Sequence, residues 1–279
     1  MPSINHNSPS ELSDLLRREG LHLSKRFGQN FLVDASVRSR IAELVVSYCP
    51  AGGPLWEIGP GVGSLTSELV ARGLHPRLFE IDHGLVRILR TEYGETLPIE
   101  VGDFVETGPV RARDEQPAVV AGNLPYASAS AMVARMIEAG ILPATLVLLV
   151  QTEFALRIAA GPGDGDYSAI SVLTRSHYAV DRAFDVGPQA FFPRPRVGSR
   201  VVVMQRHRDL PAAPIRAQSS ELARTAFSQR RKTLRNSLRT WLPQLEAAGI
   251  DPGRRPEELH PEDFLRLARI VHDAASGPA

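Results

Sequence analysis

The stretch that decides the fold is "PLWEIGPGVGSLTSELVARG", residues 54–73. It begins as an apolar, strand-like run, passes through glycines at positions 59, 61 and 63, and continues as a helical pattern that stops at Gly73. Glycines between a strand and a helix let the backbone approach a ligand closely, where the helix N-terminus offers free N–H groups. The segment therefore predicts a ligand site at the carboxyl end of a strand.

Strand-like and helical patterns alternate on both sides of this stretch. Further strands are expected at "RLFEID" (77–82), "IEVGD" (99–103), "PAVVAGN" (117–123) and "ATLVLLV" (144–150). This alternation predicts a Rossmann-like α/β fold with a parallel, doubly wound sheet. Beyond it, "AVDRAFDVG" (179–187) and "RVVVM" (200–204) predict more strands. A proline-rich linker then leads to a helical tail.

These patterns predict two domains. The first, residues 1–209, is the α/β domain with a helical N-terminal extension, and the second, residues 210–279, is a small helical domain. The chain of 279 residues is 43% hydrophobic with a net charge of +1, as is ordinary for a globular protein. We expect a cytoplasmic protein, because neither a membrane span nor a signal pattern is present. We also expect a monomer. The single cysteine, Cys49, argues against a multi-cysteine metal site, and we expect no metal.

Carboxylates follow the second and third expected strands. Glu80 is placed to accept the hydroxyls of a ribose, and Asp103 offers an acceptor for an adenine amino group. The dinucleotide pattern Gly-x-Gly-x-x-Gly is not met, because the third glycine comes one residue early. An adenosine ligand is therefore favoured over a nicotinamide cofactor.

The tetrad Asn123-Leu124-Pro125-Tyr126 ends the fourth of these strands. An adenine amino group is a poor nucleophile because its lone pair is delocalised into the ring. The Asn123 side-chain oxygen and the Leu124 carbonyl could accept its two N–H groups and localise that pair. Pro125 would stiffen the turn, and Tyr126 would stack on the target base. Taken alone, the tetrad favours a plain proline turn with a half-buried tyrosine.

A basic segment, "RTAFSQRRKTLRNSLRTWL", begins at Arg224 and contains no carboxylate up to Arg239. A charge run is usually a solvated helix face, but this density without counter-charge favours contact with phosphates. The best candidates for RNA binding are Arg230, Arg231, Lys232 and Arg235. Phe227, Leu234 and Leu238 are expected to point into the small domain.

The motifs "GQNFLVD", "EIGPGVGSLT", "FEID", "GNLPY", "FFPRPRVGS" and "AFSQRRKTLRNSL" occur in an order that resembles the KsgA-type ribosomal RNA adenine dimethyltransferases, relatives of the Erm and Dim1 enzymes. The resemblance covers Phe27 to about Leu238. It implies a class I methyltransferase that uses S-adenosyl-L-methionine. Its substrate would be two neighbouring adenosines near the 3′ end of small-subunit RNA, in RNA or in an immature 30S particle, converted to N6,N6-dimethyladenosine.

The resemblance also implies roles for individual residues. The donor pocket would be formed by Asn30, Leu32, Gly59, Gly61, Glu80, Asp103 and Asn123. Phe191 would close over the flipped base opposite Tyr126, unless it is a hydrophobic plug before the polyproline-like bend that follows it. The chain departs from the family pattern at Ala127-Ser128-Ala129, at Thr152 and at Gly198. The small residues after the tetrad could leave room for an added methyl group.

Two rivals share these features. An Erm-like enzyme would act on large-subunit RNA and confer antibiotic resistance, although "FSQRRKTLRNSL" favours the small subunit. A small-subunit assembly factor would bind the particle and use the donor pocket only secondarily. A nicotinamide oxidoreductase is a distant third because of the glycine spacing.

Overall fold

The structure is a computed structural model that describes residues 4–21, 29–229 and 231–276. The chain forms two compact units. The first comprises the residues up to Ala155 together with Asp181–Gln205, and the second comprises Leu156–Val180 together with the residues from Arg206 onward. The second unit thus includes residues 156–180, because side chains such as Tyr167 and Val172 pack into its core. The predicted division into domains at 209/210 stays a prediction.

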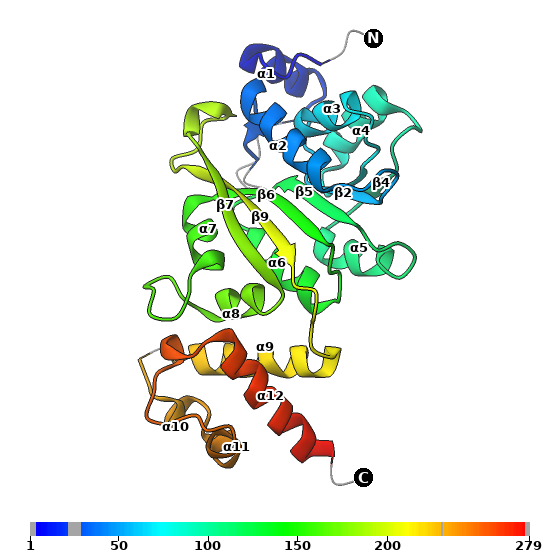
Figure 1. The fold of residues 1–279 in the computed structure, drawn as a ribbon. Helices are drawn as coiled ribbons and strands as arrows, with labels where there is room; N and C mark the ends of the chain where they lie inside the picture. Colours follow the sequence, from blue (N-terminus) through cyan, green and yellow to red (C-terminus); the bar gives the residue numbers. More distant parts are fainter. Residues whose placement is uncertain (1–3, 22–28, 230, 277–279) are drawn as a thin grey trace. The chain divides into compact units, whose positions relative to one another are not determined.

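A seven-stranded sheet in the order β4-β3-β2-β5-β6-β9-β7 organises the first unit (Figure 1). Its strands are β2 (Leu55–Ile58), β3 (Arg77–Glu80), β4 (Ile99–Val101), β5 (Val119–Asn123), β6 (Thr145–Gln151), β7 (Tyr178–Val186) and β9 (Ser199–Arg206). The predicted parallel order holds from β4 to β6, whereas β9 is antiparallel to β6.

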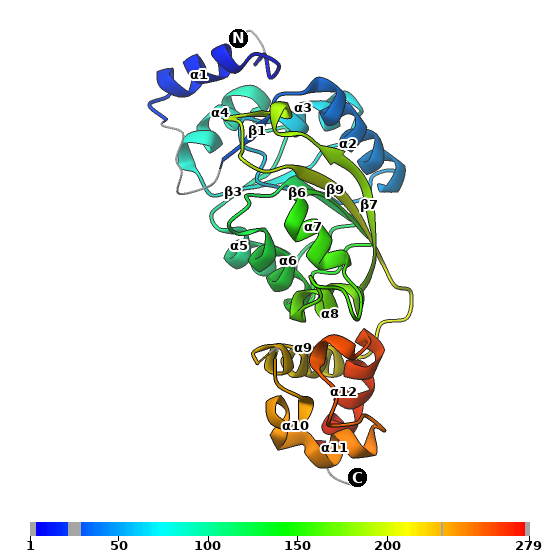
Figure 2. The same cartoon turned by 90° about the vertical axis from the view of Figure 1, so that its left-hand side faces the viewer.

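Helices cover both faces of this sheet, as expected for parallel strands that are buried on both sides (Figures 1 and 2). On one face lie α2 (Ala35–Tyr48), α3 (Ser64–Ala71) and α4 (His83–Tyr93), and on the other lie α5 (Phe104–Arg111) and α6 (Ala129–Glu138). The strand β6 is buried along almost its whole length. The predicted Rossmann-like fold is confirmed.

The N-terminal extension is a helix, α1 (Pro9–Arg18), which the hydroxyl of Ser8 caps by accepting a hydrogen bond from the Glu11 N–H at 3.3 Å. Leu12 and Leu16 on this helix pack into an apolar cluster with Phe31. Phe31 belongs to the short strand β1 (Phe31–Leu32), which pairs with β8 (Phe191–Phe192). A short 3-10 helix, η2 (Pro188–Ala190), precedes β8.

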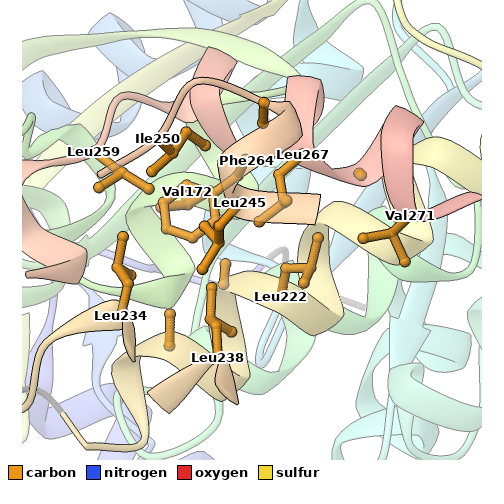
Figure 3. Packing of buried hydrophobic residues seen from close by; sticks show 14 of the residues in the cluster. Val172, Leu222, Leu234, Leu238, Leu245, Ile250, Leu259, Phe264, Leu267 and Val271 are labelled. Carbon is orange, nitrogen blue, oxygen red and sulfur yellow. The ribbon is translucent and has the colours of Figure 1, made fainter. Parts of the chain in front are cut away.

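The second unit is helical. Its elements are α8 (Ala169–Arg175), α9 (Ala213–Phe227), α10 (Leu234–Ser237), η3 (Arg239–Trp241), α11 (Leu242–Ala247), η4 (Pro256–Glu258) and α12 (Pro261–Ser276); α7 (Thr152–Ala159) begins in the first unit and ends in this one. Apolar side chains from these helices interlock around Phe264 (Figure 3). Leu234 and Leu238 are fully buried there. Phe227 is partly buried, and its ring centroid lies 5.6 Å from that of Tyr167. All three side chains thus point into this helical unit, as predicted. Among the described residues, no helix combines the length and apolar character needed to cross a membrane.

Candidate active site

A cavity of about 500 Å³ opens where β2, β3 and β5 end. The carboxyl ends of parallel strands meet at one edge of a sheet, which is where open α/β folds bind ligands. Every residue predicted for the donor pocket lines this cavity, and so does the whole tetrad: Asn30, Leu32, Gly59, Gly61, Glu80, Asp103, Asn123, Leu124, Pro125 and Tyr126. The structure thus brings together residues that lie far apart in the sequence.

The glycine loop needs glycine at its centre. Gly61 has a φ of +62°, which side chains with a Cβ rarely adopt, and a Cβ there would lie 3.1 Å from the Phe31 ring. The Gly61 N–H donates a hydrogen bond to Oε2 of Glu80 at 3.1 Å. The loop therefore lies close against its neighbours and presents backbone to the cavity.

Glu80 ends β3 and is held by its hydrogen bonds. Its Oε1 accepts from the Asp82 N–H at 2.9 Å, while Oε2 accepts from Gly61. Burial raises the pKa of Glu80 to about 7, because the charged form loses its hydration. A fixed acceptor of this kind suits hydroxyl groups of a ligand.

Glu57 is a site residue that the sequence reasoning missed. It lies in β2, lines the cavity and is 1% exposed, and it accepts a hydrogen bond from the Thr66 hydroxyl at 2.8 Å. Burial and the nearby Glu80 carboxyl raise its pKa to about 8. The signal was present in the sequence, since Glu57 is the one charged residue in an otherwise apolar strand. Glu57 is therefore largely protonated at neutral pH, and it serves the cavity as a hydrogen-bonding group rather than as a fixed negative charge.

Asp103 lies beyond the end of β4 and is the N-cap of α5. Its Oδ1 accepts a hydrogen bond from the Val105 N–H at 2.9 Å. The contact of Asp103 with an adenine amino group stays a prediction. Ile81 also lines the cavity and is 41% exposed, so that it offers an apolar surface for a flat ring.

The amide of Asn123 has a fixed orientation. Its Nδ2 donates a hydrogen bond to the Asn30 carbonyl oxygen at 2.8 Å, and that oxygen can only accept. The Oδ1 atom is buried and has no hydrogen-bond partner within the described part of the chain. A buried acceptor without a partner costs free energy, so its presence points to a ligand that donates to it. Asn30, predicted as a donor-pocket residue, also orients Asn123.

The rest of the tetrad continues from this amide. The Leu124 N–H donates to the Leu149 carbonyl at 3.0 Å, which fixes the backbone as it leaves β5. The Tyr126 hydroxyl lies 2.5 Å from the Ser199 hydroxyl, and burial raises the pKa of Tyr126. Ala127 and Ser128 also line the cavity.

Phe191 lies elsewhere than predicted. It is 4% exposed and packs in an apolar cluster with Leu32 and Val201, and it is not among the residues that line the cavity. The pairing of Phe191 with Leu32 in the β1–β8 ribbon turns its ring into the core. The structure therefore does not bring Phe191 to a position opposite Tyr126.

With this geometry established, the comparisons with known proteins identify the family. The family model "Ribosomal RNA adenine dimethylase" matches residues 20–273. The chain belongs to this family. The predicted family and the predicted class of enzyme, an RNA adenine methyltransferase, are thus confirmed.

Relatives match the dimethylase over nearly its whole length. "Ribosomal RNA small subunit methyltransferase A" of Treponema pallidum is 36% identical over 276 residues, which cover 95% of this chain and 96% of that protein. The protein of the same name from Chromobacterium violaceum is 38% identical over 259 residues, covering 89% and 95%.

Among solved structures, the 23S rRNA methyltransferase ErmE matches with a TM-score of 0.60 and 28% identity over 88% of this chain and all of that one. A dimethyladenosine transferase from Plasmodium falciparum matches with a TM-score of 0.66 over 84% of this chain and 94% of that one; its 23% identity speaks for the fold alone.

The cofactor of the dimethylase is S-adenosyl-L-methionine, as predicted. The cavity fits this donor, because Glu80 holds two acceptor oxygens in place for hydroxyl groups and Ile81 offers an apolar surface to a flat ring. Asn123, whose Oδ1 has no partner within the described chain, lines the same cavity.

The predicted RNA-binding residues of the dimethylase lie in the second unit. Arg231 and Lys232 occupy the turn between α9 and α10, and Arg235 lies on α10; all three are exposed. Arg230 lies outside the described residues. In the described residues, the basic segment therefore runs from the end of α9 through a turn to the short helices α10 and η3, so its cations do not wind around one continuous helix.

Proposed function

We propose that this enzyme transfers methyl groups to N6 of two adjacent adenosines near the 3′ end of small-subunit ribosomal RNA during small-subunit biogenesis. Relatives that are 36–38% identical over about nine-tenths of the chain carry the name of a small-subunit RNA methyltransferase. The observation that carries the proposal is the buried Oδ1 of Asn123, which has no partner in the described part of the chain and belongs to a residue that lines the cavity.

The roles of the tetrad follow from its chemistry. The adenine must leave its stack to enter the cavity, at a cost of a few kcal/mol. Stacking on Tyr126 would offset this cost by about 1–3 kcal/mol. Oδ1 of Asn123 and the Leu124 carbonyl then accept the two N–H groups of the amine and localise its lone pair. Pro125 holds both acceptors in position.

The donor supplies an electrophilic methyl group when it is bound. The residues of the chain hold donor and base in line, so that proximity and orientation provide most of the acceleration. Asn123 polarises the amine but does not take its proton, which leaves to water after the transfer. Glu80 is assigned to the ribose, Asp103 to the adenine, and Asn30, Leu32, Gly59 and Gly61 to the walls of the donor site.

Dimethylation makes a demand on space. After the first transfer the amine has one N–H left, and the pocket must accept an added carbon. Ala127 and Ser128 line the cavity and are small. We expect Ala127→Leu to stall the product at N6-monomethyladenosine, measured by nucleoside analysis. Ser130→Leu, at an exposed position outside the lining, is the control and should leave dimethylation intact.

The second unit is assigned to RNA. Arg231, Lys232 and Arg235 are exposed. Together with Arg230 they would contact phosphates, which gives affinity that falls steeply with salt. We further propose that the enzyme acts as a cytoplasmic monomer.

The decisive experiment uses the purified enzyme and methyl-labelled S-adenosylmethionine. Unmethylated small subunits and, separately, large subunits are incubated with both, and the modified nucleosides are identified. We expect label in N6,N6-dimethyladenosine of the small-subunit RNA alone. Label confined to large subunits would instead support the Erm-like function, which the similarity to ErmE makes the second candidate. Binding of small subunits without any label would support the assembly-factor alternative.

A further inference from the structure

The ring of Tyr126 should stack on a base most readily if another residue fixes its orientation beforehand. The ring is half-buried in the wall of the cavity, and its residue lies in the turn between β5 and α6. A tyrosine side chain has rotamer freedom that must be given up when a base stacks on it. A residue that fixes the ring beforehand lowers this entropic cost.

Ser199 is the residue that makes such a contact. Its Oγ lies 2.5 Å from the hydroxyl oxygen of Tyr126, a short hydrogen bond between side chains 73 residues apart in the sequence. Ser199 is 1% exposed, so its hydroxyl depends on this kind of partner. The contact involves only the hydroxyl group of the tyrosine, so it does not cover the faces of the ring on which a base would stack.

The sheet explains why Ser199 is in reach. The strands β5 and β6 run parallel and end at the same edge, whereas β9 runs antiparallel to β6 and therefore begins at that edge. Ser199 is the first residue of β9 and is paired with Gln151, the last residue of β6. The tetrad leaves β5 at this edge too, so the antiparallel strand brings a hydroxyl to it.

The backbone next to Ser199 is itself fixed. The Thr152 N–H donates to the Gly198 carbonyl at 3.1 Å. A Cβ at position 198 would lie 3.3 Å from Oγ1 of Thr152, so these two departures from the family pattern pack against one another. Ser199 is therefore anchored on both sides, by this junction and by the β6–β9 ladder.

We propose that Ser199 is a positioning residue for base capture: its hydrogen bond to the Tyr126 hydroxyl holds the ring ready for the extruded adenine. This inference rests on the proposed function, since it gives the ring of Tyr126 its stacking role. It assigns to β9 a part in the reaction beyond completing the sheet.

A double-mutant cycle tests the proposal. Tyr126→Phe removes one hydroxyl and keeps the ring, and Ser199→Ala removes the other. Each variant and the double variant are assayed with unmethylated small subunits for kcat and KM, and the Kd of S-adenosylmethionine is measured by calorimetry. Ser219→Ala, which truncates a buried serine of the second unit, is the control for the loss of a buried hydroxyl.

We expect each single variant to lose about tenfold in kcat/KM for the RNA substrate, with the donor Kd changed less than about twofold. The double variant should lose little more than either single one, because both remove the same hydrogen bond. The proposal is overturned if Tyr126→Phe or a folded Ser199→Ala keeps full kcat/KM, if their losses multiply, or if the donor Kd rises in parallel. Wild-type enzyme that forms no dimethyladenosine would refute the proposed function itself, whereas an active wild type with independent losses refutes only the role of Ser199.

Discussion

The cavity of the first unit and the basic turn of the second, which carries Arg231 and Lys232, differ in how they would bind a ligand. In the cavity, polar groups are buried, oriented by backbone contacts and few in number; Asn123 and Glu80 each hold fixed hydrogen bonds. In the turn, Arg231 and Lys232 are exposed and act together with neighbouring cations. Removing one buried, preorganised group should have a large effect, because no neighbour can take its place. Removing one of several exposed charges should have a small effect, because salt screens each charge and its neighbours still attract phosphates.

The comparison predicts its largest effect at Asn123. Asn123→Ala removes the only side-chain acceptor assigned to the amine, and methyl transfer should fall by roughly 100- to 1,000-fold, as for other preorganised polar groups. Initial rates on unmethylated small subunits measure this, with particle binding assayed in parallel and expected to persist. Gln205→Ala, at an exposed amide on β9, is the control. Unchanged methylation by Asn123→Ala would refute the catalytic assignment of the tetrad.

A substitution at Gly61 tests whether the affinity for S-adenosylmethionine depends on the close approach of the glycine-loop backbone to this donor. Gly61→Ala places a Cβ at a φ of +62° and 3.1 Å from Phe31, and we expect the Kd of S-adenosylmethionine to rise by about tenfold, ~1.4 kcal/mol. Gly73→Ala is a matched control, because its φ is +78° but nothing lies within 4 Å of its Cβ. Both variants should lose about 1–2 kcal/mol of stability from backbone strain. Equal donor affinity of the two would contradict the assignment of the loop.

Glu57 and Glu80 predict how stability depends on pH. Their folded pKa values, about 8 and about 7, lie above the ordinary value of 4.5, so the unfolded chain releases these protons first. The free energy of unfolding should therefore fall as pH rises from 6.5 to 8, by at most about 1.4 kcal/mol per pH unit for each group. The buried His6 and His177, whose pKa values are lowered to about 4, make the free energy of unfolding rise with pH up to their ordinary value of 6.5, and this opposing effect fades above it.

Denaturant unfolding of the donor-free enzyme at several pH values measures this slope. Glu57→Gln removes the group with the higher pKa and should flatten the slope between pH 7 and 8. An identical slope in wild type and variant would show that Glu57 is ionised in the folded enzyme at neutral pH.

The smallest effect is expected in the basic turn. Lys232→Ala removes one of several phosphate contacts and should weaken RNA binding a few-fold, lowering the slope of log K against log salt by about 0.7–0.9. Binding measured between 50 and 200 mM salt checks this expectation. Arg18→Ala, an exposed cation on α1, is the control and should leave the slope unchanged. A loss as large as that of Asn123→Ala would erase the contrast between the two regions.

Sequence reasoning located the cavity because strand ends are readable from local patterns. Glu80, Asp103 and Asn123 each follow an apolar run, and parallel strands place such residues at one edge. It failed at Phe191, whose direction depends on a partner strand, and at the basic segment, where the turn after α9 interrupts the expected helix. Glu57 was overlooked although it is the one charged residue in an otherwise apolar strand; its partner Thr66, which lies on α3, is known only from the structure.

The sequence by itself determined the α/β alternation, the glycine loop and the polar residues that follow the strands, since these depend on local backbone preferences and on the period of apolar residues. Only the tertiary structure decided how those residues are aimed. The amide of Asn123 takes its direction from the Asn30 carbonyl, 93 residues away, and Tyr126 meets Ser199 because β9 runs antiparallel beside β6. Such contacts depend on strand order and direction, which local sequence does not encode.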